Sequence, residues 1–73
     1  MTREEVLKVA RSTVEKQGWP WEEPVLVKRE RKFVIVGAIL WHVTTNANYR
    51  GANANVWIDD KTGRVVSKAF APR

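Results

Sequence analysis

Few side chains in this chain could do covalent or acid–base chemistry. Its 73 residues include one histidine, His42, and no cysteine, which excludes disulfides, thiolate zinc sites and thiol nucleophiles. His42 stands between apolar neighbours, and no serine and carboxylate accompany it in a triad-like pattern. The acidic pairs at 22–23 and 59–60 are chain neighbours, and such pairs rarely converge on one substrate atom. We therefore expect no enzymatic activity, no metal and no cofactor, and we expect solvated loop charge at both acidic pairs.

The most specific stretch for binding is the asparagine-rich segment NANYRGANAN at residues 46–55. Asparagine tolerates left-handed backbone and bonds its own chain, so one interpretation is a well-ordered turn. The other interpretation is an exposed tip that inserts into a partner. Both stay open, and the candidate partner-binding residues of this segment are Tyr49 and Arg50.

A basic cluster offers a second kind of binding. The chain carries a formal net charge of +5, which favours acidic partners without naming one. Basic patches with stacking aromatic side chains hold single-stranded nucleic acid in some small folds, but neither RNP-type nor KH-type motifs occur here. A solvated strand face is the simpler interpretation. The cluster consists of Lys28, Arg29, Arg31 and Lys32.

One helix precedes these candidates. The pattern over residues 2–17 predicts this helix, because Thr2 and Glu5 have the spacing of a capping box and apolar residues recur at i, i+3 and i+4. Gly18 suits the position just after the helix, and Pro20 prevents its continuation. A helix this short needs a tertiary partner, so its apolar stripe predicts a sheet to lie on.

Residues 18–24 predict a connector between the helix and the sheet, because prolines in it exclude a regular ladder. The connector also carries Trp19 and Trp21. We interpret them as a lid that closes one end of the core, since large aromatic side chains are usually mostly buried. The alternative is an aromatic platform for carbohydrate or peptide.

Alternating apolar residues predict four antiparallel strands in a meander over residues 25–71. Gly37 joins the first two strands, and the segment at 59–63 forms the hairpin before the last. The expected fold class is α+β, a single domain over residues 1–73 in which one helix packs on a curled four-stranded sheet. The expected strands cover residues 25–36, 39–45, 54–59 and 64–70.

The same alternation predicts an apolar patch on the sheet face that the helix leaves uncovered. Leu40 and Trp57 point to that face, and His42 lies at its border, if residues of the opposite parity face the helix. Such patches on small proteins mark a partner surface or a homodimer interface. The alternative is a twisted sheet that covers these residues itself. The residues expected toward the helix are Ile39, Trp41, Val43, Val56 and Ile58.

Three strings in the second half of the chain resemble PepSY-like domains: Trp41-His-Val-x-Thr-Asn46, Arg50-Gly51-x-Asn53, and Val56-x-Ile58-Asp59-x-x-Thr62-Gly63-x-Val65. They also resemble the related small immunity-protein families described as nuclear-transport-factor-like, and the broader architecture is cystatin-like. The resemblance implies a non-catalytic bacterial α+β domain that binds or inhibits another protein, often a peptidase or a toxin. The Gln-x-Val-x-Gly loop of cystatins is not matched, because residues 33–37 contain no glutamine.

The expected location is the cytoplasm, without membrane contact. The first residues lack the apolar core of a signal peptide, and the longest apolar run, residues 33–41, is about half the length of a membrane-spanning helix. The expected function is a non-enzymatic protein-binding or inhibitory module whose partner is another protein or a second copy of the chain. The alternative is a small basic module that binds nucleic acid.

Overall fold

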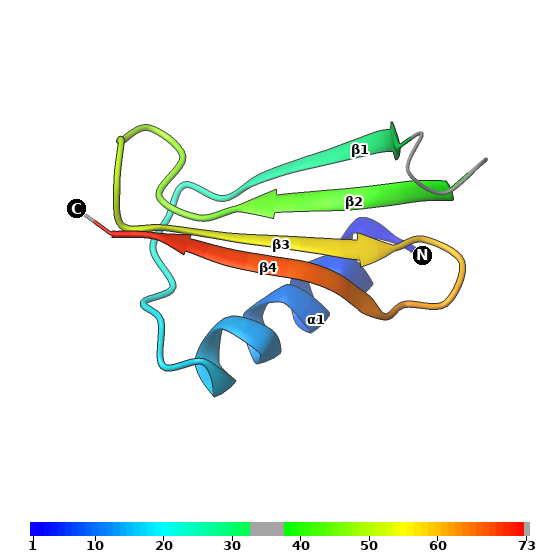
Figure 1. The fold of residues 1–73 in the computed structure, drawn as a ribbon, viewed down its shortest axis with the longest axis horizontal. Coiled ribbons are helices and arrows are strands. Elements are labelled where there is room, and N and C mark those ends of the chain that lie inside the picture. Colours follow the sequence, from blue (N-terminus) through cyan, green and yellow to red (C-terminus); the bar gives the residue numbers. More distant parts are fainter. Residues whose placement is uncertain (33–37, 73) are drawn as a thin grey trace.

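The computed structural model describes residues 1–32 and 38–72. One helix precedes four strands, which pair antiparallel in the order β1-β2-β3-β4 (Figure 1). The predicted α+β fold, one N-terminal helix with a four-stranded antiparallel meander, is therefore confirmed. The elements are α1 (Arg3–Lys16), β1 (Leu26–Lys32), β2 (Ala38–Thr44), β3 (Asn53–Asp59) and β4 (Val65–Ala71).

The described strands begin and end close to the predicted positions. The first strand, predicted over residues 25–36, covers Leu26–Lys32 in the structure, so the basic run lies within a strand. The remaining predicted residues 33–36 and the predicted turn at Gly37 lie outside the described residues. The hairpin before β4 is present, and Gly63 has the positive φ of 73° that this turn requires.

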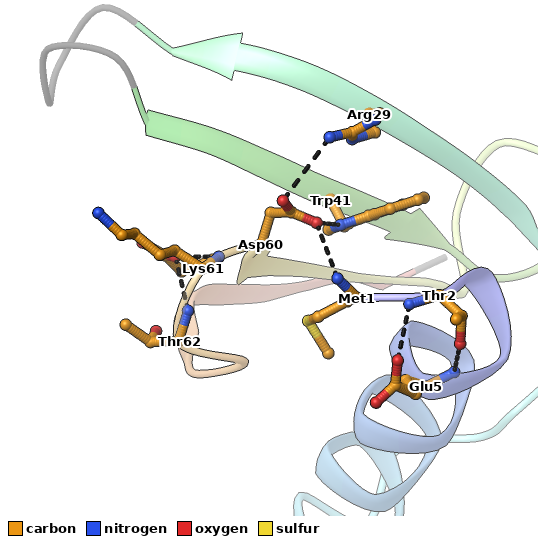
Figure 2. A network of polar contacts seen from close by, with 9 residues as sticks. Met1, Thr2, Glu5, Arg29, Trp41, Asp60, Lys61 and Thr62 are labelled. Atoms are coloured by element: carbon orange, nitrogen blue, oxygen red, sulfur yellow. Dashed lines mark hydrogen bonds and ion pairs between the residues drawn. The ribbon is translucent and has the colours of Figure 1, made fainter.

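Both ends of α1 follow from the residues that the sequence places there. The Thr2 hydroxyl accepts a hydrogen bond from the Glu5 amide at 3.2 Å, and the Glu5 carboxylate accepts one from the Thr2 amide at 2.8 Å (Figure 2). The backbone hydrogen bond from Thr2 lowers the pKa of Glu5. Gly18, just beyond the helix, has a φ of +74°, a left-handed conformation that glycine adopts without strain.

The core lies between one stripe of α1 and one face of the sheet. Strand β3 alternates strictly between buried and half-buried residues, as a strand with one covered face should. Its buried residues meet the buried residues of α1 and of β2. Among the described residues, the fully buried apolar side chains are Val6, Ala10, Val14, Val43, Ala54, Val56 and Ile58.

The two tryptophans of the connector pack against this core, as expected for a lid. Both are partly buried against it. The Trp19 ring stacks on Phe70 of β4, with ring centroids 5.6 Å apart and an interplanar angle of 23°. The guanidinium of Arg11 lies over the Trp21 ring, 5.9 Å from its centroid. The connector therefore closes one side of the space between the helix and the sheet.

Candidate functional site

Strand register divides the sheet into a face covered by α1 and an open face. Trp41 pairs with Ile58 and Val43 with Val56, and these positions belong to the covered face. The alternate pairs, Leu40 with Asp59, His42 with Trp57 and Thr44 with Asn55, point the other way. The open face is defined here by Leu40, His42, Thr44, Asn55 and Trp57.

An aromatic pair forms the centre of the open face. The His42 and Trp57 rings are stacked, with centroids 4.4 Å apart and an interplanar angle of 13°. Both residues are half-buried, and so is the neighbouring Leu40. Leu26, which pairs with Thr44 at the edge of the same face, is 44% exposed. The predicted outward direction of Leu40 and Trp57 is therefore observed, and the patch is half-buried rather than fully exposed.

Polar side chains fix the orientation of the His42 ring. Its Nε2 lies 2.9 Å from Asn55 Oδ1, within hydrogen-bond distance. The Thr44 hydroxyl also donates to Asn55 Oδ1, at 3.0 Å, and its oxygen lies 3.1 Å from Nε2. On the other side of the ring, Nδ1 lies 3.7 Å from the Glu30 carboxylate. The ring is thus held as part of a surface, with one nitrogen engaged by Asn55.

The asparagine-rich segment combines an ordered base with an exposed tip. The Asn53 amide donates to the carbonyls of Thr45 and Asn46, both at 2.9 Å, and to that of Tyr49 at 3.2 Å. Asn46 is buried in the left-handed conformation, with a φ of 51°. Tyr49 is 66% exposed and Arg50 is exposed beside it. The segment therefore has an ordered turn at its base, as the first interpretation expects, and an exposed tip at Tyr49 and Arg50, as the second expects.

The base of this segment is bound to the connector. The Asn46 amide donates to the Glu22 carbonyl at 2.7 Å, and the Ala47 amide donates to the Pro24 carbonyl at 2.9 Å. A shallow cavity of about 460 Å³ opens there, lined by Glu22, Glu23, Asn46 and Tyr49. Among the described residues, Glu22 Oε2 is buried without a hydrogen-bond partner. The expectation of solvated charge at 22–23 is therefore wrong for Glu22, because the loop docks over it.

The same expectation is wrong for Asp60, which connects three parts of the chain (Figure 2). Its Oδ1 accepts the Trp41 indole N–H at 2.6 Å and lies 3.4 Å from the Met1 ammonium group. Its Oδ2 lies 3.6 Å from the Arg29 guanidinium. The hydrogen bond from Trp41 is the main cause that lowers the pKa of Asp60. Its neighbour Asp59 orders the turn by accepting from two backbone amides.

The basic cluster is divided between the two faces of the sheet. Lys28 pairs with His42 and therefore belongs to the open face, whereas Arg29 pairs with Trp41 on the covered side. The Arg29 guanidinium also lies over the Trp41 ring, 5.4 Å from its centroid, in addition to its contact with Asp60. The cluster continues along β1 with Arg31 and Lys32, whose backbones pair with Ile39 and Ala38. Lys28 and Arg29 thus do not contribute to one common basic surface.

Within residues 1–32 and 38–72, no group of three or more His, Asp or Glu side chains is placed to hold a metal ion. In the same part of the chain, no helix has the length and apolarity needed to cross a membrane.

Sequence reasoning missed two organising side chains, Asp60 and Asn53. The presence of Trp41 indicates that an acceptor such as Asp60 lies nearby, because an indole N–H on a half-buried side chain usually finds a hydrogen-bond partner. The signal for Asn53 is its position where the loop ends and the strand begins, from which a side-chain amide can reach several loop carbonyls. No protein-family model, curated protein or solved structure matches the chain. The resemblance to PepSY-like and cystatin-like domains accordingly stays a prediction.

Proposed function

We propose that the chain is a non-enzymatic protein-binding or inhibitory module of PepSY-like or cystatin-like type. The open face is its binding surface, and the Tyr49–Arg50 tip lies at one end of the same sheet. The observation that carries the proposal is the stacked His42–Trp57 pair, with Leu40 beside it, on the face opposite the helix. The partner is another protein or a second copy of the chain.

The physics of protein interfaces supports this assignment. Binding energy concentrates in a few aromatic and arginine side chains at the centre of an interface. An aromatic side chain that is already fixed loses little conformational freedom on binding. The His42–Trp57 stack is fixed from one side by Asn55 and Thr44, so it is a preorganised centre of this kind.

The chemistry of the open face supports binding rather than catalysis. The Nε2 of His42 is engaged by Asn55, and the neighbouring hydroxyl of Thr44 donates to that same amide oxygen. A hydroxyl is activated as a nucleophile by donating its proton to a basic nitrogen, and the Thr44 hydroxyl donates to Asn55 instead. The cysteine-free composition requires no oxidising compartment, which supports a cytoplasmic location.

The alternative, nucleic-acid binding, predicts a different result. A salt-dependent gel shift with single-stranded RNA or DNA that is lost on neutralising Lys28, Arg29, Arg31 and Lys32 together would favour it. The opposite directions of Lys28 and Arg29 on β1 support the protein-binding proposal instead.

Site-specific photo-crosslinking tests the proposal. A benzophenone side chain in place of Leu40 reports on the open face, and the same probe in place of the exposed Ser12 of α1 is the matched control. We expect a discrete protein adduct, heterologous or with a second copy, from position 40 and not from position 12. Adducts of equal yield from both positions, or an adduct with nucleic acid alone, would contradict the proposal.

A further inference from the structure

The outer edge of β4 is one of the two unpaired edges of the sheet. β4 is the last strand in the order β1-β2-β3-β4 (Figure 1), and α1 packs mainly on β3 and β2. Most of the strand is exposed, including Val66 at 47%. Among the described residues, no backbone hydrogen bond beyond the ladder to β3 reaches Val65–Ala71. Such an edge can pair with another extended chain.

Hydrogen-bond alternation shows which groups point outward along this edge. The Thr45 amide donates to the Ala54 carbonyl, so the backbone N–H and C=O groups of Ala54 point toward β2. In an antiparallel pair the direction alternates, so Asn55 directs its N–H and C=O toward β4. Asn55 pairs with Ala69 and Trp57 with Ser67, and these two β4 residues therefore face β3. The amide and carbonyl groups of Lys68 and Phe70 point away from the sheet.

The side chains along the edge define what an added strand would meet. Lys68 pairs with Val56 and Phe70 with Ala54, so both side chains lie on the helix side of the sheet. The Phe70 ring stacks on Trp19. Lys68 is exposed and has no ion-pair or hydrogen-bond partner among the described residues. An added strand thus meets one free cation and one aromatic surface, two residues apart.

The two edges of the sheet differ sharply in charge. β1 has the sequence LVKRERK, in which charged residues dominate, and charged edge strands resist pairing. β4 has the sequence VVSKAFA, with Lys68 as its single charge. If two copies paired along the whole length of β4, Lys68 at its centre would lie opposite Lys68 of the other copy. Like charges directly opposite destabilise a strand pair, whereas an acidic side chain at that position is attracted.

We propose that the β4 edge binds an extended segment of a partner protein by strand addition. The segment carries an acidic residue opposite Lys68 and an apolar residue opposite Phe70. The edge and the open face are separate surfaces, so either assignment can fail without the other.

Amide hydrogen exchange of the full chain, measured by NMR with a heptapeptide, tests the proposal. The probe is Ac-Thr-Val-Thr-Glu-Thr-Val-Thr-NH2, and the control replaces its glutamate with lysine. We expect the glutamate peptide to slow exchange at Lys68 and Phe70, whose N–H groups point outward. Ser67 and Ala69 should change little, because their N–H groups already pair with β3. The lysine peptide should bind about fivefold more weakly.

A charge-reversed variant, Lys68→Glu, should invert the preference between the two peptides while the chain stays folded, because residue 68 is exposed. Unchanged exchange at Lys68 and Phe70 with both peptides would overturn the proposal, as would equal binding of both. Protection of these amides that rises with protein concentration in the absence of peptide would also overturn it, since the occupant would then be a second copy. Changes in exchange confined to Leu40 and Trp57 would likewise overturn the proposal, because the peptide would then bind the open face.

Discussion

The two faces of the sheet use the same strands for different purposes. On β3, the residues that face the helix, Ala54, Val56 and Ile58, are fully buried and apolar. The residues between them include Asn55 and Trp57, which are half-buried and contact other side chains of the open face. The covered face is explained by burial against α1. The open face is ordered by its own stack and hydrogen bonds, which folding alone does not require.

This difference indicates where stability and binding reside. Burial of apolar side chains is the main stabilising contribution in a small domain, so truncations on the covered face should unfold the chain. Changes on the open face should mostly leave it folded. Substitutions on the two faces should therefore differ in their effect, from a large loss of stability to almost none.

The largest loss is expected from Ile58→Ala on the covered face. Ile58 is fully buried and is the largest completely buried side chain in the part of the chain that the structure describes. Its truncation removes apolar contacts and leaves a cavity, which costs about 2–5 kcal/mol in the free energy of unfolding. Urea denaturation followed by tryptophan fluorescence measures the change. A loss below about 1 kcal/mol would mean that this face is not the tightly packed core that the structure shows.

A smaller but clear loss is expected from Asn53→Ala, at the start of β3. Its side chain donates to three loop carbonyls, and leaving such acceptors unpaired costs about 1–3 kcal/mol. The matched control is Asn48→Ala, because Asn48 is exposed in the same loop. The same denaturation experiment compares the two variants. If both lose equal stability, the loop does not depend on the Asn53 hydrogen bonds.

Asp60 should make stability depend on pH. Its pKa is lowered in the folded chain, so its carboxylate stabilises the fold above the pKa of the unfolded state, near 3.8. This contribution is lost as the pH falls through the lowered folded value. The pKa of Glu5 is also lowered in the folded chain, so Glu5 adds a pH dependence of the same sign. Comparing the wild-type chain with the variant Asp60→Asn isolates the contribution of Asp60. The stability difference between the wild-type chain and this variant should shrink as the pH falls below about 4.

Denaturation curves at pH 7 and at several acidic values measure that difference, with Glu23→Gln at an exposed connector position as the control. A difference that stays constant with pH would show that the Asp60 carboxylate does not stabilise the fold through its charge.

The smallest change in stability is expected from Leu26→Ser, on the open side at the β1 edge. Leu26 is 44% exposed, and substitutions at such surface positions usually change stability by no more than about 0.5 kcal/mol. Thermal unfolding measured by circular dichroism checks this. A loss comparable to that of Ile58→Ala would show that both faces of the sheet contribute equally to the core.

Local patterns in the sequence were sufficient for much of the fold. The capping box at Thr2 and Glu5, the left-handed glycine at Gly18 and the alternation along β3 depend on residues close together in the chain, so their geometry follows from spacing. The outward directions of Leu40 and Trp57 follow from the same alternation.

The features that could not be predicted depend on strand register and loop docking. Trp41 and Asp60 are 19 residues apart. They meet only because the antiparallel pairing of β2 with β3 places the end of β3 beside the first half of β2. The Glu22 Oε2 atom is buried because the loop after β2 docks on the connector. Lys28 and Arg29 lie on opposite faces only if the strand runs unbroken through the basic run. The absence of Gly, Asn and Pro from that run favours a strand but does not exclude a turn.

The central claim is that Trp57 and its neighbours on the open face bind a protein partner and contribute little to folding. The most direct test is the yield of the photo-crosslinked adduct from position 40 in the wild-type background and in Trp57→Ser. We predict that the substitution lowers the yield by about tenfold or more, as expected for the centre of an interface, while circular dichroism shows the chain still folded. An unchanged yield from a folded variant would contradict the claim.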